Sequence, residues 1–381
     1  MLTIGSFKEL DMSYNITYEA LVYNFPICQG YSLLGNSFVI NGLTMEMEEH
    51  LAPHKMPLLA NPTFYACIVN TKEFGPQYMV MKNETPIPMD LPIDAGTDAK
   101  NAIYESVVRA VETVEKHLLF TLNFPVFFPI VWLKVVAEDG KVIENYMRLR
   151  NVPVSPPGGK WTSHLGLLDI NKRMGAGFSK ESLDEFLSNK NCVRYKHAYE
   201  YYIRSFYETS HDTSFCCLLS SIDAITGSRN KEHLTKVRLA KYSSVLLCEP
   251  LLIEKNEQVM KLFYKQRSEF VHGKGTRIKV GDEFVLREYV RIFLITYFLF
   301  WQELKVTNEP QMLQKLDSIY NDQSLYTKET PCAYFFVSAM RKHERGFERM
   351  FEITLEEQER LAHRILSEPL ESQYLRVQAG N

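Results

Sequence analysis

The most apolar stretch of the chain, from Tyr289 to Trp301, constrains the fold more than any other feature. A bilayer-spanning helix takes ~20 apolar residues, whereas this stretch is shorter and contains Arg291. A helix that is apolar nearly all round has to be covered by other elements on every side. We therefore predict that residues 283–304 form a helix buried inside a helical bundle.

Four segments ahead of this helix show helical periodicity and can supply that cover. Apolar residues recur every three or four positions in each of them, and the segments are 194–207, 213–225, 232–247 and 253–271. Short connections between such helices favour an antiparallel bundle. We predict an all-α bundle over residues 190–305, followed by a helical extension over residues 306–381.

Residues 1–185 have a different pattern, in which aromatic and β-branched runs typical of strands alternate with turn signals. Asp139 and Gly140 form a hairpin signal, whereas Pro86, Pro88 and Pro92 indicate an irregular connection. The predicted strands are 18–25, 64–70, 78–81, 127–136 and 142–149, with a helix over 98–119. The prediction is a mixed α/β domain, so the chain as a whole belongs to the α+β class.

The seven cysteines are scattered and none forms a CxxC pair, so neither a disulfide framework nor a zinc site is expected. We predict no metal and no cofactor. Residues Met1 to Leu10 lack the sustained apolar run of a signal peptide. A cytoplasmic protein that is not associated with a membrane is therefore expected.

The segment whose side chains are best suited to catalysis places Arg267 and His272 near the end of a predicted helix, before Gly273. The planar guanidinium of arginine fits phosphate oxygens, and the charge of histidine changes near neutral pH. Together they can bind a phosphodiester and transfer protons around it without a metal ion. From Lys261 to Lys279 there are six basic residues and one acidic residue, which favours a polyanionic ligand.

This region resembles the HEPN superfamily, and its Apea-like branch most of all. The likeness is carried by the run Tyr264-x-x-Arg267-Ser268-x-x-x-His272-Gly273 in its setting of four other helices. The resemblance implies a metal-independent endoribonuclease that works as a homodimer or a larger homo-oligomer, with two Arg/His pairs at the interface. Five positions on a helix separate two side chains by ~140°, so either the helix end distorts at His272 or a second subunit completes the site.

The resemblance also implies transesterification, in which the RNA 2′-OH attacks the adjacent phosphorus. His272 is then the general base or acid, Arg267 stabilises the phosphate charge and Ser268 orients a phosphate or a histidine. Glu269 is expected to pair with the imidazolium, three positions away. The residues expected to contact substrate are Tyr264, Lys265, Lys274 and Arg277.

The partner implied is RNA, with tRNA as one candidate. The resemblance suggests a toxin or an anti-phage effector of abortive infection, and a free ribonuclease would harm its host. Residues 1–185 are therefore expected to act as a sensing or regulatory domain, under the control of a trigger or an antitoxin partner.

Other interpretations remain open. Arg267 could pair with a carboxylate and His272 could cap its helix, which would leave a non-catalytic RNA- or nucleotide-binding module or an interaction subunit. Arg204 and His211 form a second Arg-x6-His pair. His211, however, lies in a Ser- and Thr-rich stretch typical of a turn and a helix N-cap.

Overall fold

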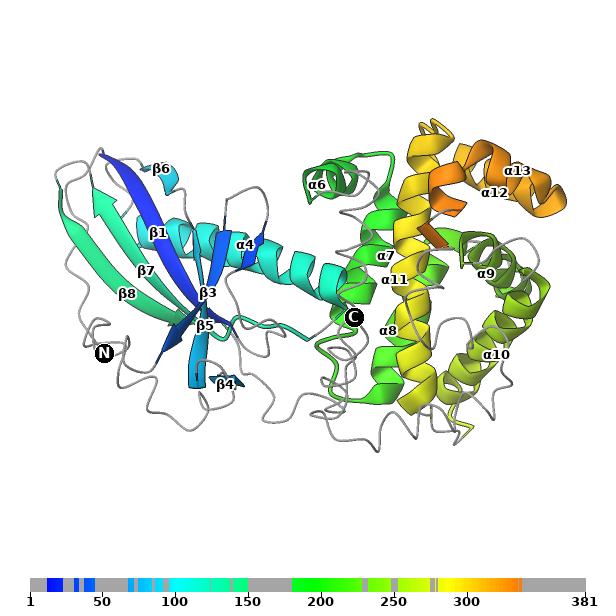
Figure 1. Cartoon of the computed structure of the whole chain (residues 1–381), viewed down its shortest axis with the longest axis horizontal. Helices are drawn as coiled ribbons and strands as arrows, with labels where there is room; N and C mark the ends of the chain where they lie inside the picture. The colour runs from blue at the N-terminus through cyan, green and yellow to red at the C-terminus, as the bar shows by residue number, and fades with distance from the viewer. Residues whose placement is uncertain are drawn as a thin grey trace. The chain divides into compact units, whose positions relative to one another are not determined.

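The computed structural model shows two compact units (Figure 1). The first falls within residues 1–118 and 125–156, and the second within 119–124 and 157–381. This division lies ahead of the 185–190 boundary predicted from composition. The structure describes residues 12–22, 31–33, 38–44, 68–71, 75–83, 86–91, 96–123, 125–137, 140–149, 180–227, 232–247, 253–274, 278, 280–334 and 336–337.

The first unit contains an antiparallel sheet in the order β2-β3-β5-β1-β7-β8. Strand β1 is central: it pairs with β7 along one edge, while β6 and β5 share its other edge, opposite its first and second halves. The strands are β1 (Met12–Val22), β2 (Tyr31–Leu33), β3 (Phe38–Thr44), β4 (Ile68–Thr71), β5 (Gly75–Asn83), β6 (Ile87–Leu91), β7 (Ile130–Ala137) and β8 (Val142–Arg148).

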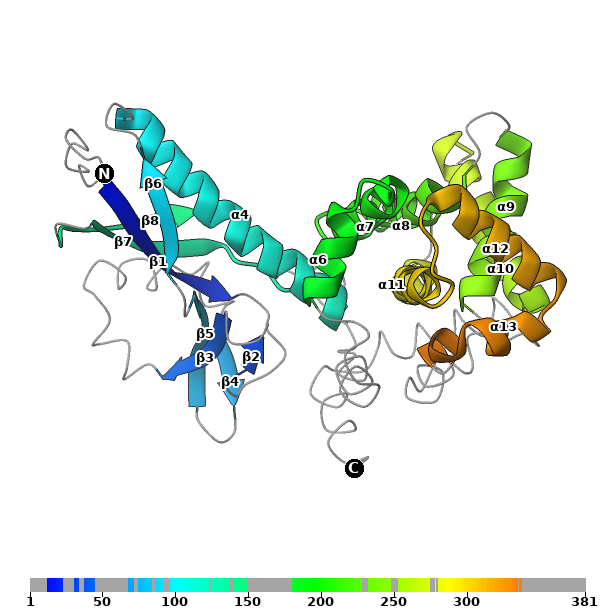
Figure 2. The same ribbon diagram turned by 90° about the horizontal axis from the view of Figure 1, so that it is seen from above.

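Helix α4 (Gly96–Leu122) lies along one face of this sheet (Figures 1 and 2). Its residues Val107, Val111 and Val114 follow the helical spacing predicted from the sequence and are fully buried. The buried carboxylate of Glu115 accepts a hydrogen bond of 2.8 Å from the backbone N–H of Phe128. The helix therefore contributes both an apolar face and one polar tie to the core of the unit.

The proline-rich connection between β5 and α4 differs from the prediction. Pro88 lies in strand β6, opposite Asn15 of β1. Proline donates no ladder hydrogen bond but is tolerated where a strand lies at an edge, so its presence did not exclude a strand. The hairpin signal is confirmed, since Gly140 has a φ of +79° between the antiparallel β7 and β8.

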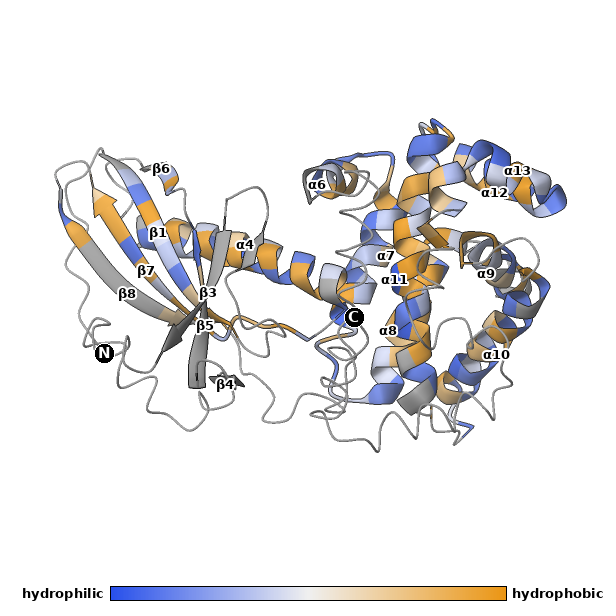
Figure 3. Cartoon of the chain, in the orientation of Figure 1, coloured by the Kyte–Doolittle hydropathy of each residue, from blue (hydrophilic) through white to orange (hydrophobic). Residues whose placement is uncertain are grey.

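The second unit is helical, which confirms the α+β class. Helix α11 runs through its middle and is seen nearly end-on in Figure 2. Every residue from Val285 to Trp301 is buried, and Figure 3 shows how apolar this helix is, so the predicted central position is confirmed. The helices are α6 (Lys180–Ser188), α7 (Val193–Arg204), α8 (His211–Thr226), α9 (Glu232–Leu247), α10 (Ile253–Val271), α11 (Val280–Glu303), α12 (Glu309–Asn321) and α13 (Ser324–Glu329).

None of the helices that the structure describes combines the length and the apolar character needed to cross a bilayer.

Helix α11 nevertheless carries charged side chains inside this apolar core. Arg287 is 1% exposed and forms an ion pair with Glu283, one turn earlier on the same helix. Its guanidinium also donates to the hydroxyls of Ser205 (2.5 Å) and Ser214 (2.6 Å) and lies 4.3 Å from the ring centre of Phe206. Burying a charge is costly unless it is paired and hydrogen-bonded, and these contacts meet that condition.

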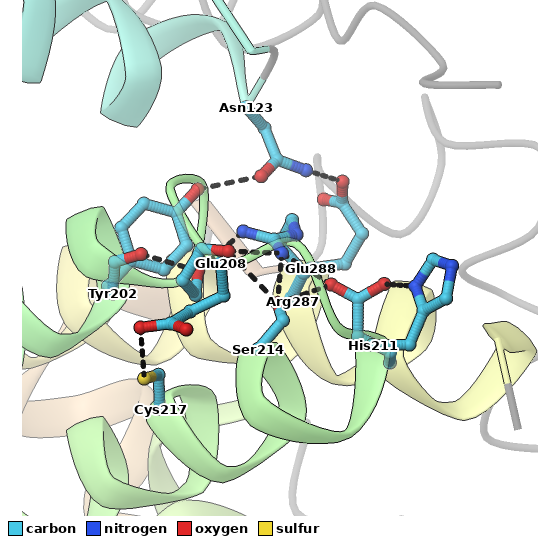
Figure 4. Close-up of polar contacts among 10 residues, drawn as sticks. Asn123, Tyr202, Glu208, His211, Ser214, Cys217, Arg287 and Glu288 are labelled. Atoms are coloured by element: carbon cyan, nitrogen blue, oxygen red, sulfur yellow. Dashed lines mark hydrogen bonds and ion pairs between the residues drawn. The ribbon is translucent and has the colours of Figure 1, made fainter. Parts of the chain in front are cut away.

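A second buried charge lies one turn further along α11. Arg291 is fully buried and pairs with Glu288 at 3.0 Å. Glu288 also accepts a hydrogen bond from the amide of Asn123, whose oxygen accepts one of 2.7 Å from the hydroxyl of Tyr202 (Figure 4). Asn123 has a positive φ of +49°, a conformation that asparagine tolerates better than most residues. The segment just after α4 is thereby joined to α7 and α11.

We predict that Arg287→Met destabilises the protein by about 3–5 kcal/mol, because it removes the buried guanidinium that pairs with the carboxylate of Glu283. Urea unfolding followed by circular dichroism measures the loss.

The matched control is Arg204→Met. Arg204 also has a glutamate partner four residues away, Glu208, but is 67% exposed. Exposed pairs contribute about 0–1 kcal/mol, so a similar loss in both variants would contradict the importance assigned to the buried pair.

Candidate active site

The predicted motif lies at the C-terminal end of α10, which a glycine terminates. The N–H of Lys274 donates to the carbonyl of Glu269 (2.9 Å), and that of Gly273 donates to Phe270 (3.0 Å). Gly273 has a φ of +68°. These two bonds and the left-handed glycine form a Schellman motif, so the helix ends in an ordered way. His272 is exposed as the last residue before this glycine.

Arg267 lies one turn earlier and contacts α8. Its guanidinium lies 3.6 Å from a carboxylate oxygen of Asp223 and 3.5 Å from the hydroxyl of Ser220. Burial raises the pKa of the Asp223 carboxyl, and Arg267 opposes that shift without cancelling it. A quarter of the Arg267 side chain, 25%, remains exposed. The arginine is thus oriented by α8 while part of it can still reach a ligand.

No hydrogen bond or ion pair joins Arg267 to His272 among the described residues. The predicted pairing of Glu269 with His272 is likewise not among the contacts seen there. Glu269 lies 3.8 Å from the ammonium of Lys265 instead. Ser268 is half-buried, and its carbonyl accepts the N–H of His272 at 3.0 Å.

The four residues expected to contact substrate have different environments. Lys265 and Lys274 are exposed, and Tyr264 is half-buried. Arg277 lies outside the described residues. Two exposed ammonium groups therefore flank the Arg267 and His272 positions along α10 and its C-terminal cap.

The second Arg/His pair does not lie on one helix. Helix α7 ends at Arg204 and α8 begins at His211. Arg204 pairs with Glu208 at 3.2 Å, whereas His211 turns toward α11. This separation removes the shared helical face on which a paired role for Arg204 and His211 would depend.

A histidine–carboxylate pair that the sequence did not indicate involves His211. Its Nδ1 lies 3.2 Å from a carboxylate oxygen of Glu283 (Figure 4). The other oxygen of Glu283 accepts a hydrogen bond of 2.8 Å from Ser214 and pairs with Arg287. Sequence reasoning missed this pair because its members lie 72 residues apart. The one available signal was two acidic residues, Asp282 and Glu283, at the start of an apolar helix.

Two further contacts place this pair at the same end of the helical unit as the motif. Gln266, next to Arg267, donates to Asp282 at 2.7 Å. Asp212, next to His211, accepts the backbone N–H of Ile278 at 2.8 Å. Figure 1 accordingly shows the last turn of α10 near the first turns of α8 and α11.

The pKa values within the His211 pair are shifted in opposite directions. Burial alone raises the pKa of Glu283, but Arg287 and hydrogen bonds from His211 and Ser214 outweigh it and lower the value to about 2. The hydrogen bond that His211 donates to Glu283 raises the pKa of His211, against the effects of burial and Arg287. Both shifts favour an imidazolium that faces a carboxylate.

Among the described residues, no three His, Cys, Asp or Glu side chains are grouped so that they could hold a metal ion. Comparison with known proteins finds no matching family model, no similar curated protein and no similar solved structure. The HEPN resemblance therefore rests on the motif and its helical setting, and it stays a prediction.

The lowered pKa of Glu283 predicts an acid-dependent loss of stability. The unfolded chain takes up this proton near the ordinary value of 4.5, and the folded protein only near about 2. Glu283 therefore stabilises the fold above pH 4.5, and the contribution is lost as the pH falls toward 2. The difference in unfolding free energy between wild type and Glu283→Gln should shrink over that interval.

Urea unfolding of both proteins at a series of pH values measures this difference. Glu329→Gln is the control, since Glu329 is 34% exposed and lies 3.6 Å from Lys315. A wild-type advantage over Glu283→Gln that stays constant from pH 6 to pH 2 would contradict the assigned ionisation of Glu283.

Proposed function

We propose that the helical unit is a metal-independent endoribonuclease of the HEPN type, with Arg267 and His272 at its active site. The observation that carries the proposal is the exposure of these two side chains near the C-terminal end of α10. Arg267 is held by Asp223 and Ser220 yet keeps 25% of its side chain exposed, and His272, five positions further along the chain, is exposed. Both are thus accessible to a polyanionic substrate.

The reaction follows from the chemistry of the two side chains. Histidine can accept the proton of the RNA 2′-OH as that oxygen attacks phosphorus. The guanidinium stabilises the negative charge that builds up on the phosphate oxygens, an effect worth roughly 3–4 kcal/mol for one well-placed donor. The products are a 2′,3′-cyclic phosphate and a 5′-OH, and DNA is spared because it has no 2′-OH.

The proposed site is completed by a second copy of the chain. Arg267 and His272 lie ~140° apart around an ideal helix, and the Schellman motif at Gly273 keeps the helix end regular. Arg267 is also committed to α8 through Asp223. In a symmetric dimer each surface is used twice, so an arginine from one subunit can meet a histidine from the other.

We expect purified protein to cleave RNA in the presence of EDTA, and Arg267→Ala and His272→Ala to lower the rate by about 100-fold or more. Cleavage of a labelled RNA pool, resolved on a gel, measures the rate.

Arg204→Ala and His197→Ala are matched controls, because both residues are exposed on α7. Full activity of Arg267→Ala and His272→Ala would contradict the proposal, as would cleavage that needs an added metal ion. RNA binding by the wild type without cleavage would favour the non-catalytic module.

A site that takes its arginine from one subunit and its histidine from the other leads to a separate prediction. When Arg267→Ala and His272→Ala subunits are mixed and allowed to exchange, each mixed dimer contains one intact pair. Activity should then rise well above that of either variant alone. Mixtures that stay as inactive as their components would show that each site is built within one chain, or that the protein does not dimerise.

The cellular role we propose is that of a toxin or anti-phage effector, with the sheet-bearing unit acting as the regulator. It is supported by the resemblance and by the presence of a separate unit with its own core. Sequencing RNA ends in cells that express wild type or Arg267→Ala identifies the RNA that is cut. Identical end profiles in the two cultures would count against this role.

A further inference from the structure

His211 has the geometry of an oriented proton donor. Its Nδ1 lies 3.2 Å from the Glu283 carboxylate, and the imidazole is 32% exposed while Glu283 is only 6% exposed. Figure 4 shows His211 with a dashed contact at one of its two ring nitrogens, which is the contact of Nδ1 with Glu283. A carboxylate that binds one nitrogen of a histidine sets the ring orientation and leaves the other nitrogen for proton transfer.

The carboxylate that orients His211 is itself held in place. Glu283 pairs with the buried Arg287 and accepts a hydrogen bond of 2.8 Å from Ser214. The Ser214 hydroxyl also lies 3.1 Å from the carbonyl oxygen of Ser205 and accepts a hydrogen bond of 2.6 Å from Arg287. The carboxylate that orients His211 is therefore held by contacts from α8, α11 and the C-terminal end of α7.

His211 also lies next to the elements that carry the proposed catalytic pair. Its neighbour Asp212 binds the N–H of Ile278, in the connection that follows His272. Gln266, next to Arg267, binds Asp282, the residue before Glu283. Two hydrogen bonds thus link the immediate neighbours of His211 and Glu283 to α10 and to the connection that follows it.

The charges around His211 favour its protonated form. Glu283 on α11 and Asp212 on α8 raise its pKa, whereas Arg287 on α11 and burial lower it, and the net shift is upward. A raised pKa extends the pH range in which His211 is an imidazolium, and the imidazolium is the form from which a general acid donates its proton.

We propose that His211 is the general acid of the ribonuclease reaction, donating its proton to the 5′-oxygen of the leaving nucleotide. This inference rests on the function proposed above. As the 2′-oxygen forms its bond to phosphorus, its proton passes to His272. As the bond from phosphorus to the 5′-oxygen breaks, that oxygen takes the proton of His211. Exchange with water returns both histidines to their starting states.

Replacement of one atom of the substrate tests this role. An RNA oligonucleotide is made in two forms, with either oxygen or sulfur at the 5′ bridging position of the cleaved linkage. A thiolate leaves without needing a proton, so a general acid matters only for the oxygen form. We expect His211→Ala to lower the cleavage rate of the oxygen form by about 100-fold or more and that of the sulfur form by less than about tenfold.

Two further variants, measured on the same substrates, serve as references for this result. His272→Ala should slow both substrates, because the 2′-OH must lose its proton in either case, and His197→Ala should slow neither. Equal losses on the two substrates for His211→Ala would mean that His211 has only a structural role. Undiminished cleavage of the oxygen form by that variant would also overturn the assignment.

The pH dependence supplies a second readout. The wild-type rate should fall at high pH as His211 loses its proton, and that fall should be absent in His211→Ala. A high-pH fall that persists in the variant would contradict the proposal. A wild-type protein that cleaves neither substrate would instead refute the ribonuclease function itself, so the two failures are distinguishable.

Discussion

The burial of two arginines on one apolar helix is the constraint on which the helical unit depends. Arg287 and Arg291 lie within the core with exposed fractions of 1% and 0%, so each needs partners from neighbouring elements. Glu283 and Glu288 supply the charge on α11, and the surrounding segments supply the hydrogen bonds. Because an unpaired buried charge costs several kcal/mol, helices that pack around α11 have to present polar groups at set positions.

The same polar layer reaches the surface at His211. Glu283 connects the interior arginine to a histidine that is one-third exposed, near the end of α10 where Arg267 and His272 lie. The buried ion pair that stabilises the core and the candidate catalytic residue His211 therefore share the carboxylate of Glu283. A change that loosens Arg287 should affect the orientation of His211 as well as stability, since both act through one carboxylate.

The sequence predicted the helical unit well and the sheet less well, for a physical reason. Helical periodicity is local, and the predicted segments 232–247 and 253–271 coincide with α9 and α10. Strand pairing depends on distant partners, so β2, β3 and β6 were not predicted, and Pro88 was assigned to an irregular connection. The same distinction holds in the site: the Arg267 and His272 motif is local, whereas the pairing of His211 with Glu283 spans 72 residues.

By itself, the sequence determined the α+β class, the central place of the apolar helix and the position of the Arg/His motif near a glycine-terminated helix end. Each of these follows from the spacing of residues within one segment. Only the tertiary structure decided that Arg267 faces Asp223 and that His211 binds a carboxylate held by a buried arginine. Which charged groups become neighbours depends on how helices pack, and that information is absent from the pattern of any single segment.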